Sequence, residues 1–307
     1  IKKDKTLLFV GFEGLRQNAQ NAVPLLTNTD IFRPTAAQDA IIAGLSTSSA
    51  PVTCFTGVIL PGNLCAFALQ SVLTINPNPG PNPFVTPGQA ALNSFLVNQF
   101  ETQGGLFPYD SREYLGSARL DHHFNVNNEI SVTYRYGHDL EESPDVQSLT
   151  AYSAGSSVHT YDNNLQAAWY HQLSATAQNE ARVQWDYNSF NVIPNEPGQV
   201  GLQIPSFINN LGTNIFLPSI SILRRYEFAD NFTVIRGHHT LKFGGYELLR
   251  GNHTESHTFF PGRFVFGSLP GGLISPQLAT TTVNPLQSAS LGLPQVYQQG
   301  FGDPTYP

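Results

Sequence analysis

The stretch YLGSARLDHHF at residues 114–124, followed after a short turn by ISVTYRY at residues 130–136, decides the fold. Apolar and aromatic residues mostly occupy the even positions of both segments, and polar residues such as Arg119 and Asp121 occupy the odd ones. Asn125, Asn127 and Asn128 lie between the segments. Alternation over about ten residues, interrupted by short turns, is typical of strands in membrane-spanning β-barrels. The two segments therefore predict a hairpin of an antiparallel barrel.

Further alternating segments surround this hairpin, and the connections between them are long and short in turn. The predicted strands cover residues 6–15, 114–124, 130–136, 164–173, 181–188, 226–234 and 240–249. The long connections cover residues 16–111, 139–157 and 191–221. Because outer-membrane barrels have short periplasmic turns and longer extracellular loops, residues 2–5 are expected on the periplasmic side. The sequence predicts an all-β, antiparallel up-and-down meander: a partial transmembrane β-barrel of about seven strands with long extracellular loops.

Three local features refine this prediction. Tyr134, Tyr136, Trp185 and Tyr187 lie toward the long-loop ends, as an interfacial aromatic girdle requires. The alternation fails after residue 243, which predicts a bulge near Gly244 and Gly245. Residues 263–267 are expected in an extracellular hairpin, because an eighth spanning strand would place a long connection on the short-turn side.

The first connection, residues 16–111, is expected to be an extracellular loop with two short helices, at residues 35–45 and 87–100. Between them, the run NPNPGPNP at residues 76–83 cannot itself be the interior of a strand or helix. Cys54 and Cys65 are the chain's two cysteines. In an exported protein, a pair in a loop predicts a disulfide, although two free thiols remain possible.

Composition agrees with an outer-membrane protein and excludes several other classes. Charged residues make up 12% of the 307 residues, whereas soluble domains carry about 25%. The net charge is −7 without a basic run, so we expect no nucleic-acid partner. No apolar run reaches the length of a transmembrane helix. The chain contains no Met and begins at Ile1 without an apolar leader, so we expect it to be an internal piece of a longer chain with its export signal upstream.

The sequence points to no enzyme, cofactor or resident metal. Nucleophile, zinc-protease, P-loop and dinucleotide motifs are absent from it. His253, Glu255 and His257 alternate, but this spacing suits no zinc-enzyme pattern, and we expect solvated loop side chains. Five charged residues are expected to face the lumen: Arg119, Asp121, Arg135, Arg182 and Asp186. They predict a charge ladder across neighbouring strands, with contacts to substrate or plug as the alternative.

Several segments, in this order, resemble TonB-dependent receptors of the Oar-like type. They are IKKDKTLLFVGFEGLR at residues 1–16, RLDHHF at 119–124, NEAR at 179–182, IRGHHTLKFGG at 235–245 and LGLP at 291–294. The resemblance implies an amino-terminal carboxypeptidase-regulatory-like sandwich, a plug domain that engages TonB, and a barrel of about 22 strands. It also implies the partners: TonB through the plug, outer-membrane lipid and lipopolysaccharide, and an imported nutrient such as a siderophore, oligosaccharide or peptide. Residues 1–307 would then be about the first third of the barrel, in the outer membrane of a Gram-negative bacterium.

A different class of protein shares many of these features. Soluble β-sandwiches also alternate and also have loops rich in Pro and Gly. The alternative function is therefore a surface-exposed adhesin or glycan-binding β-domain without transport.

Overall fold

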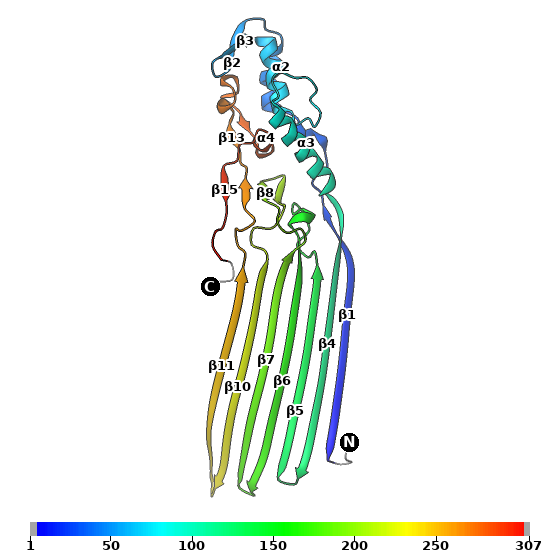
Figure 1. The fold of residues 1–307 in the computed structure, drawn as a ribbon, viewed down its shortest axis with the longest axis vertical. Coiled ribbons are helices and arrows are strands. Elements are labelled where there is room, and N and C mark those ends of the chain that lie inside the picture. The colour runs from blue at the N-terminus through cyan, green and yellow to red at the C-terminus, as the bar shows by residue number, and fades with distance from the viewer. Residues whose placement is uncertain (1–4, 304–307) are drawn as a thin grey trace.

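The computed structural model describes residues 5–303 and is dominated by one seven-stranded antiparallel sheet (Figure 1). Its strands lie side by side in chain order: β1 (Thr6–Val23), β4 (Gly105–Asn125), β5 (Asn128–Glu142), β6 (Ser156–Ser174), β7 (Ala177–Pro194), β10 (Ser219–Arg236) and β11 (His239–Ser256). The predicted up-and-down meander is confirmed. Among the described residues the sheet is open, with β1 and β11 at its edges. The expected periplasmic position of residues 2–4 lies outside the described range.

The register gives the sheet one apolar face and one polar face. One row of directly paired residues runs Leu120, Val132, Ala167, Val183 and Phe228 from β4 to β10. A second row of paired residues, whose side chains point to the other side of the sheet, runs Ser117, Arg135, Asn164, Asp186 and Arg225 across the same strands. Because neighbouring positions on a strand point to opposite sides, these rows define what we call the apolar face and the polar face.

The strands extend well beyond the segments that alternate in sequence. β1 continues to Val23 and β4 begins at Gly105, so the first connection covers residues 24–104 and the predicted bounds of 16–111 were wrong. The other long connections shorten in the same way, to residues 143–155 and 195–218. The three short turns contain two residues each, at 126–127, 175–176 and 237–238. Most of the extra strand length lies at the long-connection end, away from these turns, and the rest adds one to four residues beside the turns.

The predicted bulge at Gly244 and Gly245 is wrong. β10 and β11 pair without a register shift, with Gly245 opposite Asp230 and Gly244 opposite Asn231. A Cβ on Gly244 would lie 2.6 Å from the Asn231 Oδ1 atom, so this glycine permits a close approach of the two strands. The unbroken ladder leaves Glu247 on the apolar face, opposite Phe228. Register shifts occur instead beside two of the short turns, between His123 and Asn125 and between Gln172 and Ser174.

The long connections fold together above the sheet into a body that we call the cap, residues 24–104, 143–155, 195–218 and 257–303 (Figure 1). Its helices are α1 (Ala36–Ser46), α2 (Gly62–Leu73), α3 (Pro87–Thr102) and α4 (Pro285–Ser290), with 3-10 turns η1 (Thr29–Phe32), η2 (Tyr152–Ala154), η3 (Gly271–Leu273) and η4 (Pro276–Leu278). Its strands are β2 (Pro51–Phe55), β3 (Val58–Pro61), β8 (Gly201–Ile204), β9 (Ile208–Leu211), β12 (Arg263–Val265), β13 (Leu269–Pro270), β14 (Thr282–Val283) and β15 (Val296–Gln298). The predicted helices at 35–45 and 87–100 correspond to α1 and α3. No helix within residues 5–303 is long and apolar enough to cross a membrane.

Two hydrophobic clusters hold the cap together. The larger one combines residues of all four long connections, including Phe100 from α3, Val146, Ile204 and Leu286. The smaller one lies around α2 and includes Cys65, Leu69 and Leu278. A short sheet in the order β15-β12-β8-β9 joins the last two connections, with β12 parallel to β8. Residues 263–265 therefore form an inner strand of this sheet, between β15 and β8. The prediction that residues 263–267 belong to a hairpin was wrong.

Candidate functional site: a charged sheet face beneath a cap

The Asp186 carboxylate is the centre of a polar cluster on the polar face. It accepts a hydrogen bond from the Arg225 Nε atom of β10 at 2.9 Å and further bonds from Asn164 of β6 and Gln184 of its own strand. The Arg225 Nε atom also lies 2.9 Å from Glu227 Oε1. Because the register brings these residues together from three strands, they cross-link the wall through side chains as well as backbone.

The other four charged residues expected to face the lumen also lie on the polar face. Arg119 and Asp121 share that face of β4 and are joined at 3.0 Å, and Arg182 lies 3.5 Å from Glu180 on β7. Arg135 pairs with Ser117 and Asn164 in the backbone register. Most of these ion pairs join residues two positions apart on one strand. Of the five, Asp186 forms an ion pair across strands, with Arg225 of β10, and the ladder across neighbouring strands stays a prediction.

Three members of this cluster were not predicted from the sequence: Arg225, Glu227 and Asn164. Arg225 and Glu227 flank Tyr226, so the alternation of β10 contained the signal. No sequence signal marks Asn164, because its role comes from the register that places it opposite Asp186. Which polar residues meet across strands depends on pairing, and one strand's sequence does not specify its neighbour's register.

The apolar face carries a band of exposed apolar side chains with aromatic residues at both ends. Tyr134 and Tyr136 are more than a third exposed and lie toward the cap, and Trp169 is 46% exposed and lies toward the short turns. Phe232 and Phe243 pair directly near the last short turn. A band of about ten residues per strand with aromatic edges matches the hydrocarbon layer and its interfaces.

The group His253, Glu255 and His257 is not a loop cluster as expected. His253 and Glu255 lie in β11 on the apolar face, and His257 follows the strand. The His257 Nε2 atom lies 2.6 Å from Glu255 Oε1, while His253 is opposite Ile222 in β10. Within residues 5–303, no three His, Cys, Asp or Glu side chains are arranged to hold a metal ion.

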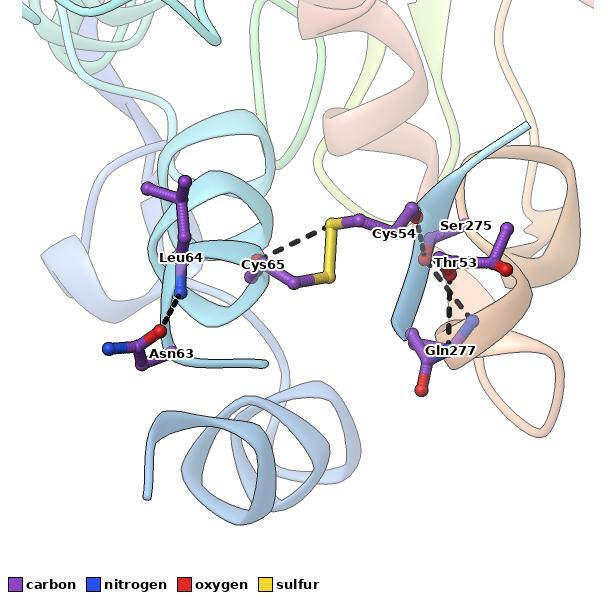
Figure 2. Close-up of a disulfide and its surroundings, with 7 residues drawn as sticks. All are labelled: Thr53, Cys54, Asn63, Leu64, Cys65, Ser275 and Gln277. Atoms are coloured by element: carbon purple, nitrogen blue, oxygen red, sulfur yellow. Dashed lines mark hydrogen bonds between the residues drawn. A yellow bond between two sulfur atoms is a disulfide. The ribbon is translucent and has the colours of Figure 1, made fainter. Parts of the chain in front are cut away.

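In the cap, Cys54 and Cys65 form a disulfide with a Cα–Cα distance of 5.4 Å (Figure 2). It joins β2 to α2, and both cysteines are fully buried. The last connection binds the same strand, because Ser275 Oγ donates to the Cys54 carbonyl and Gln277 Nε2 donates to the Thr53 carbonyl at 3.1 Å. The disulfide therefore lies at the junction between the first and last connections.

A second junction joins the same connections through buried amides. Gln38 of α1 and Gln287 of α4 exchange two hydrogen bonds, of 3.0 and 2.9 Å, and both side chains are buried. Each glutamine also completes a capping box at the start of its own helix. Buried amides whose hydrogen bonds are satisfied fix one relative arrangement of the elements that carry them.

An apolar pocket of about 380 Å³ lies in the cap. Three connections supply its walls: α3 from the first, β8 and Val200 from the third, and β12 with α4 from the last. None of its lining residues carries a polar or charged side chain. The described residues thus provide two candidate sites: charged clusters along the polar face of the sheet, and an apolar pocket in the cap beyond the long-connection end.

Comparisons with known proteins identify the family. A family model described as "Outer membrane beta barrel domain" matches residues 1–306, and none of the curated proteins matches. Among solved structures, the outer membrane transporter YddB from Escherichia coli is similar at 13% identity with a TM-score of 0.42, over 53% of this chain. The chain covers 22% of that transporter's length. Because the family model matches nearly every residue, the chain belongs to the outer membrane beta barrel domain family and lies in the outer membrane.

Proposed function

We propose that this chain forms part of the wall and extracellular cap of a TonB-dependent, Oar-like transporter that imports a nutrient. One observation carries the proposal: a seven-stranded meander has an apolar face, a charged polar face and all its long connections packed at one end. In a barrel, the apolar face meets lipid and the polar face lines the lumen. Loops held by a rigid scaffold are where binding residues concentrate. The role is binding and transport, without a catalytic step.

The partners follow from the two faces and the cap. Outer-membrane lipid and lipopolysaccharide contact the apolar band and its aromatic edges. Arg119, Asp121, Arg135, Arg182 and Asp186 face the lumen, where they solvate and stiffen the wall or contact a plug domain. TonB acts on that plug, outside residues 1–307. The nutrient, a siderophore, oligosaccharide or peptide, enters from the cap side.

The test compares four strains that share one growth medium. They carry or lack the full-length receptor, each with and without a functional TonB. Mass spectrometry of the spent medium follows which compounds disappear. The proposal expects at least one compound to be depleted only when the receptor and TonB are both present. Equal depletion in all four strains would contradict it.

A second function is supported by the far tip of the cap. The β2–β3 hairpin exposes Ile59 at 69%, and the neighbouring helix α2 exposes Phe67 at 53%. Exposed apolar groups on a disulfide-braced tip also suit an adhesin or glycan-binding surface. Receptor-dependent attachment of cells to glycan-coated beads, without any depletion of nutrient, would favour this alternative.

A further inference from the structure

The cap pocket has a closed floor and an open mouth. At its floor, Phe266 is 7% exposed and Ala289 of α4 is 2% exposed. At its mouth, Phe95 of α3 is 43% exposed and Val200 is 45% exposed. Part of the lining is therefore shielded from solvent and part is open to it. Its volume of about 380 Å³ falls within the size range of small-molecule sites.

The walls of the pocket are held by contacts outside it. Phe264 of β12 packs against Tyr297 of β15 with ring centroids 4.5 Å apart, and β12 pairs with β8 on its other side. On the opposite wall, the Ser290 hydroxyl of α4 donates to the Asn93 side chain of α3. Since elements from three connections are fixed around it, the pocket is formed before any ligand arrives.

The chemistry of the lining selects the occupant. A sugar ring, peptide bond or charged group that entered this pocket would lose hydrogen bonds to water, and the lining side chains offer none in return. An alkyl chain or aromatic ring loses only apolar surface, which stabilises binding by about 25 cal/mol per Å² buried. The absence of charge on the walls thus favours a neutral apolar group.

We propose that the pocket between α3, β8, β12 and α4 binds an acyl or aryl group of the imported compound. This inference rests on the proposed transport function and narrows its substrate class to amphipathic molecules. Their polar part remains at the mouth, in water, while the apolar part fills the pocket. The cap then retains the compound above the lumen before it enters the barrel.

The experiment uses the full-length receptor in lipid nanodiscs and an octyl chain that carries a photoreactive diazirine and a neutral headgroup. After irradiation, mass spectrometry maps the labelled peptides. We expect label at residues 92–96, 200–202 and 264–266, and competition by excess octanol. Leu92→Gln places an amide in the wall and Val200→Trp obstructs the mouth, so each is expected to reduce this labelling about tenfold, equivalent to about 1.4 kcal/mol.

The matched control is Leu273→Gln, an exposed apolar position of the cap outside the pocket lining, which should label as strongly as the unaltered protein. Limited proteolysis of all variants checks that the cap is folded. Absence of pocket labelling in the unaltered receptor would overturn the inference, as it would mean that another segment or protein fills this space. Labelling that neither pocket variant changes would overturn it as well.

The outcomes separate this inference from the proposed function. Pocket labelling without TonB-dependent depletion of any compound would retain the apolar site and refute transport. TonB-dependent depletion without pocket labelling would retain transport and refute the acyl or aryl site.

Discussion

The Asp186 carboxylate connects three strands of the wall, and its side chain is 23% exposed. Its partners are the amides of Asn164 and Gln184 and the guanidinium of Arg225. Removing the Asp186 acceptor leaves the amides of Asn164 and Gln184 without this partner and leaves Arg225 with Glu227 alone, whereas removing Arg225 leaves Asp186 with both amides. At the scale of a residue, the loss of stability caused by a substitution therefore depends on how many hydrogen-bond partners it leaves unpaired.

Asp186→Leu should accordingly destabilise the protein more than Arg225→Leu does. We expect a loss of about 2–3 kcal/mol in the free energy of unfolding for the first and about 1 kcal/mol for the second. Urea unfolding of the full-length protein in detergent micelles measures both. Arg135→Leu is the control, because Arg135 forms no ion pair within the part of the chain that the structure describes. Equal losses for all three variants would show that the Asp186 cluster does not cross-link the wall.

Glu247 provides a second test at this scale, because the unbroken β10–β11 register places it on the apolar face opposite Phe228. A carboxylate that faces lipid is unfavourable. Glu247→Leu should therefore stabilise the protein by about 1–2 kcal/mol in unfolding from lipid vesicles. The companion Leu248→Glu lies on the polar face and should be nearly neutral. If Leu248→Glu were the more disruptive exchange and Glu247→Leu had no effect, a bulge at Gly244 and Gly245 would be the better description.

At the scale of elements, sequence patterns predicted the halves of the strands that lie in the apolar band and failed above it. In the upper half of β1, the run RQNAQN at residues 16–21 is polar on both faces. Where both faces of a strand meet water, no alternation is required, so no period-two signal exists. The helices also differ in how clearly the sequence marks them, since α1 and α3 were predicted and α2 was not. α1 and α3 begin with Thr35 and Thr86 as side-chain caps, whereas α2 begins after Pro61 without a capping hydrogen bond.

The cap and its pocket could not be predicted, because they depend on contacts between distant connections. The Gln38–Gln287 pair spans 249 positions in the chain, and both residues are ordinary capping-box glutamines in their own helices. The position of Gly62 could not be predicted from the sequence for the same reason. A Cβ there would lie 2.8 Å from the Ser48 carbonyl oxygen, so the start of α2 depends on where the preceding loop packs.

The disulfide gives a prediction for one element pair. It closes a loop with a sequence separation of 11, and loop closure of this size stabilises by about 3 kcal/mol in the chain-entropy model. Replacing both Cys54 and Cys65 by Ser should speed amide hydrogen exchange in β2, β3 and α2 by up to about a hundredfold. Exchange in the lower half of β4 is the internal control and should stay unchanged. If both regions accelerated equally, the cap and the sheet would unfold as one unit.

At the scale of the whole molecule, the two faces of the sheet should differ sharply in their tolerance of charge. Ala167 lies on the apolar face in the middle of the band, and its neighbour Gln166 lies on the polar face. Ala167→Arg should lower the free energy of unfolding from lipid vesicles by about 2–4 kcal/mol, whereas Gln166→Arg should change it little. Similar effects of both substitutions would mean that the band does not face lipid.

The strands are also longer than a membrane requires. β4 contains 21 residues and β1, β7, β10 and β11 contain 18 each, whereas about 9–11 residues cross the hydrocarbon layer. Because the apolar band begins at the short turns, the excess lies on the cap side. The wall therefore continues beyond the membrane on the cap side and supports the cap at a distance from the lipid.

The orientation of the wall in the membrane is tested most directly by labelling single introduced cysteines in intact cells. Gly80 in the cap and Asn127 in a short turn are each replaced by Cys in the full-length protein, in which Cys54 and Cys65 are oxidised. The account predicts that a membrane-impermeant maleimide labels Gly80→Cys in intact cells and labels Asn127→Cys only after the outer membrane is permeabilised. Labelling of Asn127→Cys in intact cells, with Gly80→Cys protected, would contradict the account.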